Sequence, residues 1–314
     1  MPLDPVLQEL VDHTNANPPP AGPALPVAEQ RRLIHELIES TFTAFTEPGP
    51  ELPDVHDEQV AGSHGAFGVR IYTPDAPEPH PALVYLHGGA WWLGDLAQVD
   101  AECRSLAHGA SCVVVSVDYH LAPEHKFPIA VEDCYAALCW TAENAERLRI
   151  DPRRIAVGGA SAGGNLAACV ALMARDRGGP ALAFQLLDIP ATDTRLDAPS
   201  MTENGSDYVL TRAGVEQGWG YYLRGTQDAS NPYASPMHAE SLTGLPPALV
   251  ITCEYDPLRD EGEAYARRLE EAGVPTTCKR YDGLIHGALM FTKLLPQARA
   301  CRDQKIAALA AALG

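Results

Sequence analysis

The chain has 314 residues, enough for one large α/β domain or two ordinary ones. Acidic residues outnumber basic ones by 41 to 23, and the formal net charge of −18 argues against a nucleic-acid partner, because phosphates would be repelled. Hydrophobic residues make up 46%, which excludes disorder of the whole chain. No apolar run approaches the roughly 18–20 residues needed to cross a bilayer, so stable membrane insertion is not expected.

The eight cysteines form no C-x-x-C pair and mostly lie in apolar stretches. This pattern favours buried free thiols in a reducing cytosol over a disulfide framework. The first residues, Met1 to Pro5, contain no basic segment followed by an apolar one, so no secretory signal is expected. We therefore expect a cytoplasmic protein, while its oligomeric state, including a homodimer, stays open.

Two helices are expected within residues 1–47, before any strand. The first begins at Pro5 with Asp4 as its N-cap, and the loop Pro18–Pro20 separates the two. Apolar residues recur with helical period in both: Val6, Leu7, Leu10 and Val11, then Leu33, Ile34, Leu37 and Ile38. Two strand-like runs follow between about Val55 and Tyr72.

From residue 82 onward, short apolar strands alternate with helices. The expected strands are Ala82–Leu86, Cys112–Asp118, Arg154–Val157, Phe184–Leu187 and Ala248–Cys253. The expected helices are Ala130–Ala145, Gly163–Arg175, Asp260–Glu271 and Gln297–Leu313. This alternation predicts an α/β fold, with a mostly parallel central sheet and helices on both faces.

Residues 196–233 interrupt this alternation. They contribute no convincing strand and have helical potential from Thr211 onward. We interpret them as an excursion above the sheet rather than a second domain, so residues 1–314 are expected to form one domain.

A serine flanked by small residues lies between an expected strand and an expected helix. The segment Gly159–Gly163 reads Gly-Ala-Ser-Ala-Gly and follows Arg154–Val157. A nucleophile elbow needs small neighbours because its backbone turns so sharply that larger side chains would collide. The helix N-terminus behind it favours negative charge at the reacting centre. We therefore predict that Ser161 is a nucleophile.

A serine nucleophile needs a histidine base and an acid that orients the base. In this kind of sheet the order along the chain is serine, acid, histidine. Of the eleven histidines only His238 and His286 follow Ser161. His238 would have to take its acid from the interrupting segment, so His286 is the expected base. Activity should then rise with pH through an apparent pKa of about 6–7.

Several carboxylates compete for the role of the acid. Asp256 comes directly after the strand Ala248–Cys253, and Pro257 ends the ladder there. Asp260 is better explained as the N-cap of the next helix, and Glu254 as part of the strand. Asp256 is therefore the expected partner of the histidine.

Two consecutive glycines follow the strand Ala82–Leu86. Without Cβ atoms, the amides of Gly88 and Gly89 can approach a ligand closely. Together with the amide of Ala162 they would converge on a developing oxyanion. His87 before them is expected to orient the loop rather than to act as a base.

Aromatic residues are the candidates for a substrate pocket. Trp91 and Trp92 follow the glycines, and core packing is an equally good interpretation of each. Trp219 and Tyr222 of the interrupting segment are the other candidates.

Five ordered motifs resemble the hormone-sensitive-lipase-like family of α/β-hydrolase esterases, over roughly residues 80–290. They match the family's HGGG loop, its Y-R-L-A-P-E stretch, its G-D/T-S-A-G-G elbow, the segment that rejoins cap and core, and its D-P-L-R-D-E acid motif. In this chain they are His87–Ala90, Tyr119–Glu124, Gly159–Gly164, Asn231–Pro236 and Asp256–Glu261.

The resemblance implies an α/β-hydrolase fold whose helical cap is formed by about residues 1–47 and 196–233. It also implies a carboxylesterase that needs no cofactor and acts mostly on short or medium acyl chains. Three residues depart from the family pattern: Ala90 for the third glycine, Ala160 for the polar residue before the nucleophile, and His120 for arginine.

The leading hypothesis is a serine carboxylesterase that works through an acyl-enzyme and acts on a small-molecule ester. The same mechanism would serve an amide, a lactone or an acetylated small molecule, and the sequence does not divide these. A small-molecule receptor on this scaffold is a third hypothesis, but plant receptors of this type lack the histidine that is present here as His286. No H-E-x-x-H motif or cluster of His and Cys ligands suggests a metal.

Overall fold

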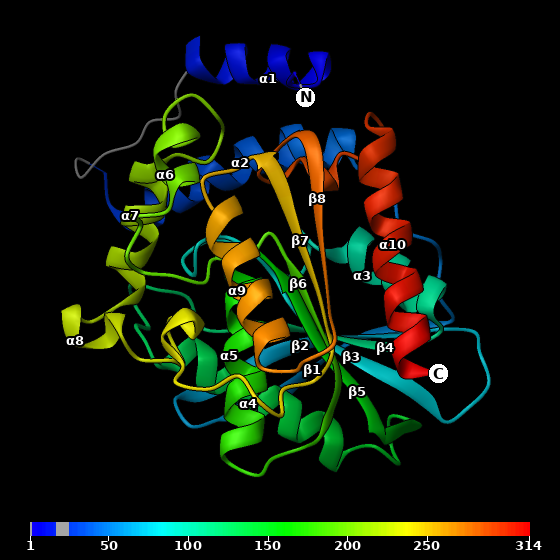
Figure 1. Ribbon diagram of the computed structural model, residues 1–314. Coiled ribbons are helices and arrows are strands. Elements are labelled where there is room, and N and C mark those ends of the chain that lie inside the picture. Colours follow the sequence, from blue (N-terminus) through cyan, green and yellow to red (C-terminus); the bar gives the residue numbers. More distant parts are fainter. Residues whose placement is uncertain (1, 17–24) are drawn as a thin grey trace.

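The computed structural model describes residues 2–16 and 25–314 (Figure 1). Within them one eight-stranded sheet has the order β1-β2-β4-β3-β5-β6-β7-β8. Its strands are β1 Asp54–Gly62, β2 Gly65–Thr73, β3 His80–Leu86, β4 Val113–Asp118, β5 Ile150–Ala160, β6 Leu182–Asp188, β7 Ala248–Tyr255 and β8 Thr276–Ile285. β1 and β2 pair antiparallel, as do β2 and β4, and the other neighbouring strands are parallel. The mostly parallel sheet predicted from the sequence is confirmed.

Helices cover both faces of the sheet (Figure 1). The faces are covered by α3 Asp100–Ala110, α4 Ile129–Glu143, α5 Ala162–Asp176, α9 Arg259–Glu271 and α10 Pro296–Leu313, whereas α1 Pro5–Ala16 and α2 Val27–Phe45 lie at one end of the strands, at the top of the view (Figure 1). Apolar residues of α4, α5 and α9 form one hydrophobic core with the sheet, and those of α1, α3 and α10 form the other. Successive residues of β3 and β4 contribute to opposite cores, which explains why these strands read as unbroken apolar runs.

The interrupting segment forms three short helices, α6 Pro199–Glu203, α7 Arg212–Tyr222 and α8 Thr226–Ala229, beside the sheet rather than in it (Figure 1). The hydroxyl of Thr211 accepts a 3.1 Å hydrogen bond from the N–H of Gly214 and so caps α7. Two single-turn helices, η1 Pro236–His238 and η2 Ala288–Met290, complete the elements.

The N-terminal helices also follow the sequence prediction. The carboxylate of Asp4 accepts a hydrogen bond from the N–H of Val6, which places Asp4 as the N-cap of α1. Leu7 and Val11 are buried, but Val6 is 43% exposed, and Leu37 of α2 is 46% exposed. The expected loop at Pro18–Pro20 lies outside the described residues.

Three details differ from the sequence prediction. Helix α3 is not among the expected helices, although its Cys103, Leu106, Ala107 and Ala110 are buried at helical spacing. The turn at the serine is a single residue, since β5 runs to Ala160 and α5 starts at Ala162. Asp260 is not an N-cap: α9 already begins at Arg259, and the carboxylate of Asp260 accepts hydrogen bonds from the N–H of Ser200 and the guanidinium of Arg259 instead.

Candidate active site

Ser161 occupies the sharp turn between β5 and α5. Its backbone has φ 58° and ψ −116°, a left-handed conformation that is strained for a residue with a Cβ. A Cβ on Gly163 would overlap the carbonyl oxygen of Leu86, and one on Gly159 would lie 2.7 Å from the carbonyl of Gly163. The small residues around the serine therefore permit strand β3, the turn and helix α5 to pack together.

Ser161, His286 and Asp256 form one chain of hydrogen bonds. Oγ of Ser161 lies 3.0 Å from Nε2 of His286, and Nδ1 of His286 lies 2.7 Å from Oδ2 of Asp256. A carboxylate only accepts hydrogen bonds, so Nδ1 carries a proton and Nε2 is left to accept from the serine. The Asp256 side chain is 1% exposed and that of His286 14% exposed. The predicted serine, acid and base residues meet at one place.

The two glycines after β3 lie beside the serine. A Cβ on Gly88 would be 3.5 Å from Cβ of Ser161 and 3.0 Å from the carbonyl oxygen of Ala160. Gly89 has φ 119°, and Ala90 and Trp91 follow with φ of 50° and 63°. The carbonyl of Gly89 accepts from the N–H of Leu93, which closes a tight turn. No described residue accepts a hydrogen bond from the N–H of Gly88 or Gly89, so both amides are available to a ligand.

His87 is buried beneath this loop. Nδ1 lies 2.8 Å from the carbonyl of Gly88 and must donate to it, and the ring stacks on Tyr119 at 4.2 Å. The hydroxyl of Tyr119 donates to the carbonyl of His87 at 2.9 Å. Burial lowers the pKa of His87, which keeps the ring neutral. These contacts fit the expected role of orienting the loop.

Three of the four predicted pocket aromatics pack on one another. The ring of Trp91 stacks on Tyr222, with centroids 4.8 Å apart, and lies 4.1 Å from that of Trp219. Trp91 is 1% exposed and its indole N–H donates to the side chain of Asn165 at 3.3 Å. Trp92 is 4% exposed and meets Tyr221 edge to face. Core packing therefore describes Trp91 and Trp92, and the cluster joins the glycine loop to α7.

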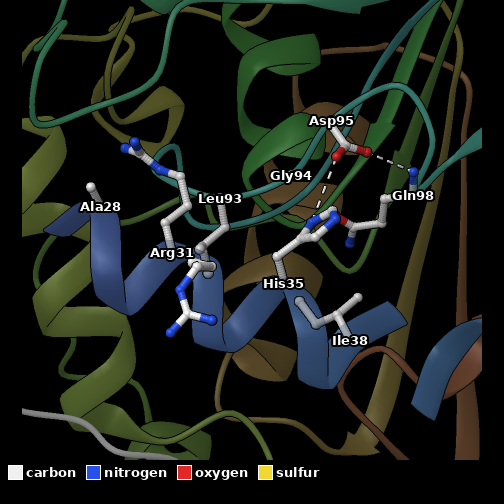
Figure 2. Close-up of a pocket in the computed structure, with 9 residues that line it drawn as sticks. Ala28, Arg31, His35, Ile38, Leu93, Gly94, Asp95 and Gln98 are labelled. Carbon is white, nitrogen blue, oxygen red and sulfur yellow. Dashed lines mark hydrogen bonds and ion pairs between the residues drawn. The ribbon is translucent and has the colours of Figure 1, made fainter. Parts of the chain in front are cut away.

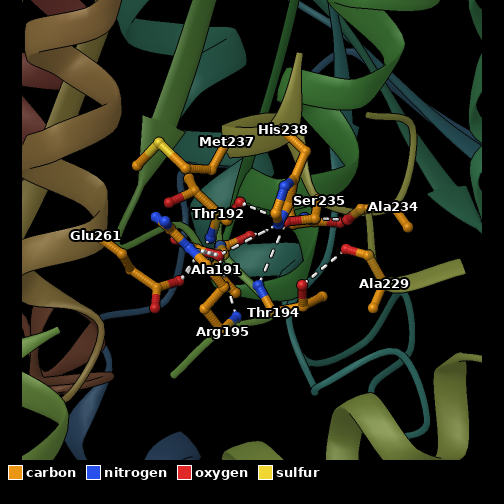
Figure 3. Close-up of polar contacts among 12 residues, drawn as sticks. Ala191, Thr192, Thr194, Arg195, Ala229, Ala234, Ser235, Met237, His238 and Glu261 are labelled. Atoms are coloured by element: carbon orange, nitrogen blue, oxygen red, sulfur yellow. Dashed lines mark hydrogen bonds and ion pairs between the residues drawn. The ribbon is translucent and has the colours of Figure 1, made fainter. Parts of the chain in front are cut away.

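Polar contacts join the two ends of the interrupting segment (Figure 3). The hydroxyl of Ser235 accepts from the N–H of Thr194 and donates to the carbonyl of Thr192. The buried carboxylate of Glu261 accepts from the N–H of Thr192 at 2.7 Å, and burial raises the pKa of this acid well above its usual range. His238, the alternative base, lies among these residues, with its Nε2 3.6 Å from Oδ1 of Asp193. Oγ of Ser161 is hydrogen-bonded to His286 instead.

A cavity of about 450 Å³ opens between α2 and the loop that follows the glycines (Figure 2). Gly94 lines this cavity and packs against His87, since a Cβ there would lie 2.5 Å from Nδ1 of that ring, whereas Ser161, Asp256 and His286 are not among the lining residues. Two of the residues that line it are in contact: Nδ1 of His35 lies 3.6 Å from Oδ2 of Asp95. The lining residues are Ala28, Arg31, Arg32, His35, Ile38, Leu93, Gly94, Asp95 and Gln98.

His120, where the resembling family has arginine, contacts a buried acid. Its Nδ1 lies 2.7 Å from Oδ2 of Asp133, which also accepts from the N–H of His120 at 3.1 Å. Asp133 is fully buried in α4. The histidine thus contacts the acid through its ring and its backbone N–H and ties the loop after β4 to that helix.

Three further properties concern the residues that the structure describes. None of their helices combines the length and apolar character needed to cross a membrane. They also contain no group of three or more His, Cys, Asp or Glu side chains arranged to hold a metal ion. All eight cysteines are described and free, as the sequence analysis predicts.

Known proteins resemble this chain over nearly its whole length. A family model described as alpha/beta hydrolase fold matches residues 83–290. The carboxylesterase NlhH of Mycobacterium tuberculosis is 39% identical over 99% of this chain and 96% of that protein. An arylesterase of Saccharolobus solfataricus is 41% identical over 83% of this chain and 84% of that protein. The structure of a hyperthermophilic esterase from the archaeon Pyrobaculum calidifontis superposes with a TM-score of 0.92, at 41% identity and 99% coverage of both chains.

The chain therefore belongs to the α/β-hydrolase fold family, within its hormone-sensitive-lipase-like esterases. The expectation of a carboxylic ester hydrolase is confirmed by these relatives.

Proposed function

We propose that this protein is a serine carboxylesterase in which Ser161 is the nucleophile, His286 the general base and Asp256 the orienting acid. The hydrogen-bonded chain from Asp256 through His286 to Ser161 carries the proposal. A base within hydrogen-bond distance of the hydroxyl is what an otherwise weak serine nucleophile requires.

The reaction proceeds in two halves. Nε2 of His286 takes the proton of Ser161 as its Oγ attacks the ester carbonyl, and the imidazolium then protonates the leaving alkoxide. An ester bond now joins the acyl group to Ser161. Water, deprotonated by the same imidazole, attacks this ester, and the proton returns to Oγ as the carboxylic acid leaves. Asp256 stabilises the imidazolium without taking a proton itself.

The amides of Gly88, Gly89 and Ala162 would bind the oxyanion formed in each half. Gly88 lies against Ser161, and the free amides of the two glycines are fixed by the turn that follows them. The amide of Ala162 belongs to the first turn of α5, where N–H groups have no partner within the helix. Each such donor contributes about 3 kcal/mol to transition-state stabilisation.

The two predicted cap segments, about residues 1–47 and 196–233, would form the cap over this site. Their helices contact each other, since the side chain of Gln217 in α7 donates to that of Gln30 in α2 at 3.2 Å. Arg31 of α2 donates to the carbonyl of Trp92 in the glycine loop at 2.8 Å. A cavity of about 450 Å³ beneath α2 suits a short or medium ester, and in this proposal it receives part of the substrate.

The cellular setting follows from the same proposal. The cysteines are free and mostly buried, which supports a protein that acts in a reducing compartment such as the cytoplasm. Hydrolysis of acyl esters there would place the protein in lipid metabolism, with a small-molecule ester as its partner.

A chain-length series tests the proposal. Wild type and Ser161→Ala are assayed side by side on p-nitrophenyl esters from acetate to laurate. We expect activity on the shorter acyl chains, a burst of p-nitrophenol from wild type, and neither burst nor turnover from Ser161→Ala. Turnover that survives in Ser161→Ala would place the nucleophile elsewhere.

A further inference from the structure

A buried ionic cluster lies below the serine and takes no part in the proposed mechanism. Nζ of Lys305 in α10 lies 2.9 Å from Oδ2 of Asp188, at the end of β6, and 2.5 Å from Oε1 of Glu102 in α3. The side chains of Lys305 and Asp188 are 4% and 6% exposed. Strand β6 and helices α3 and α10 thus meet at one buried cation.

Burying charged groups carries a desolvation penalty that offsets much of what their attraction contributes to stability. Burial raises the pKa of the Asp188 carboxyl, and its Oδ1 has no hydrogen-bond partner among the described residues. Burial alone would lower the pKa of Lys305, but the attraction of Asp188 and Glu102 raises it well above its usual range, so the ammonium stays charged. Buried ion pairs of this kind often stabilise no better than apolar residues of similar volume. The cluster therefore calls for an explanation other than stability.

The position of this cluster next to the serine suggests an explanation. The carbonyl of Asp188 accepts a 2.8 Å hydrogen bond from the N–H of Ser161, and the N–H of Ala191 donates to the carbonyl of Ser161 at 3.3 Å. Residues 188–191 therefore hold both backbone polar groups of the serine.

The backbone is strained on both sides of this contact. Ser161 has φ 58°, and Ile189, the residue after Asp188, has φ 41°. A β-branched residue with positive φ is a rare and costly conformation. It persists only where the surrounding structure holds it. Asp188, whose side chain pairs with Lys305, directly precedes that strained residue, and the N–H of Ile189 donates to the carbonyl of Ile251 in β7 at 2.8 Å.

We propose that Lys305 is a positioning residue for the nucleophile, acting through Asp188 on the backbone of Ser161. The inference rests on the proposed role of Ser161. Lys305 holds the side chain of Asp188, the carbonyl of Asp188 holds the N–H of Ser161, and the serine hydroxyl is thereby kept in line with Nε2 of His286. Loss of the anchor lets the turn relax, which displaces Oγ.

Lys305→Met tests this, because methionine keeps most of the volume and removes the ammonium. We expect kcat to fall by roughly 10- to 100-fold, the range for a displacement of about 1 Å, while KM stays within about twofold. Labelling of the serine by a fluorophosphonate should slow in parallel with kcat. The matched control is Lys279→Met, an exposed lysine of β8, which should leave both rates unchanged.

A second variant separates positioning from stability. Lys305→Met leaves the carboxylates of Asp188 and Glu102 without their cation, so its Tm should drop. Asp188→Asn and Glu102→Gln, combined with Lys305→Met, remove both unpaired charges, and the Tm of this triple variant should return toward wild type. Under the proposal kcat stays low in the triple variant because the anchor is still missing. Recovery of kcat together with Tm, or an unaltered kcat in Lys305→Met, would overturn the proposal.

Failure of the proposed function would look different. Mass spectrometry of the fluorophosphonate-labelled wild type identifies the nucleophile directly, before any Lys305 variant is measured. Label on a residue other than Ser161 would refute the proposed function. Label on Ser161, with equal labelling rates in wild type and Lys305→Met, would refute only the positioning role.

Discussion

Asp256 and His286 are 30 positions apart in the chain, and Oδ2 of the first lies 2.7 Å from Nδ1 of the second. The other carboxylate oxygen of Asp256 accepts a 2.8 Å hydrogen bond from the N–H of Leu258. Both oxygens of a buried acid are therefore occupied, which fixes its orientation and, through it, the imidazole. Precise placement of the base begins with the loop that follows β7.

Asp256→Asn should show what this acid contributes. The amide keeps the shape but removes the negative charge and can hold the imidazole in the wrong tautomer, so kcat should fall by about 10³- to 10⁴-fold. KM should change little, because the side chain is buried away from the substrate. Steady-state kinetics on p-nitrophenyl butyrate provide the measurement. Asp282→Asn, an exposed acid four residues before His286, is the control. A loss of less than tenfold in Asp256→Asn would argue against the assigned acid.

The pH dependence of stability should include a contribution from His87. Burial lowers the pKa of this histidine in the folded protein, whereas in the unfolded chain it is about 6.5. Below pH 6.5 the unfolded state therefore binds a proton that the folded state does not, so this contribution to stability is complete above about pH 6.5 and is lost as the pH falls. The slope from this one group is at most about 1.4 kcal/mol per pH unit.

Urea unfolding of wild type and His87→Gln between pH 5 and 7.5 measures this contribution. The free energy of unfolding of His87→Gln should be lower at neutral pH but fall less steeply toward pH 5. His64→Gln, an exposed histidine in the turn between β1 and β2, should keep the wild-type slope. Equal slopes in all three proteins would mean that His87 is protonated in the folded state as readily as in the unfolded one.

The sequence was most informative where local chemistry and position in the fold coincide. Ser161 could be found because small flanking residues mark a strained turn between a strand and a helix. Asp256 could be found because it directly follows the strand Ala248–Cys253, and His286 because only two histidines follow Ser161 in the chain. Asp260 was misassigned as a cap, since an acid near a helix start has the same local signature whether it caps the helix or pairs with a neighbouring segment.

Contacts between distant segments left little trace in the sequence. Asp188 reads as the polar end of a strand, and Lys305 as one charge in an alanine-rich helical segment. Their 2.9 Å contact depends on how α10 crosses the end of β6, which local patterns do not define. For the same reason the sequence did not decide whether Trp91 lines a pocket or packs in the core, because this depends on the position of α7.

A substitution of Arg31 tests how helix α2 is held over the candidate active site. Its guanidinium donates to the carbonyls of Trp92 and Ala122 and pairs with both carboxylate oxygens of Glu124. Hydrogen bonds from a charged donor contribute about 1.5–3 kcal/mol each. Arg31→Met should loosen α2, raise KM by about tenfold if roughly 1.4 kcal/mol of substrate binding is lost, and leave the burst intact.

Glu36→Gln is a control from the same helix. Glu36 is exposed, lies outside the lining of the cavity and pairs with Arg32 within α2, so the kinetics of Glu36→Gln should match wild type. Limited proteolysis adds a second readout, in which only Arg31→Met should be cut faster within residues 27–45. Equal KM values in the two variants would mean that the cavity beneath α2 does not bind the substrate.

Two glycine substitutions should separate steric necessity from helix propensity. A Cβ on Gly163 would overlap the carbonyl oxygen of Leu86 and lie 2.6 Å from that of His87, so strand β3 and the glycine loop would have to move. Overpacking of this kind costs about 1–3 kcal/mol or more, and Gly163→Ala should also lower kcat because the displaced loop carries Gly88. At Gly220, on the exposed side of α7, a Cβ would meet nothing within 4 Å, so Gly220→Ala should stabilise by about 0.5–1 kcal/mol. Denaturant midpoints and kcat measured on both variants provide the check. Wild-type stability and activity in Gly163→Ala would mean that β3 and α5 are packed less closely than their contact at the serine requires.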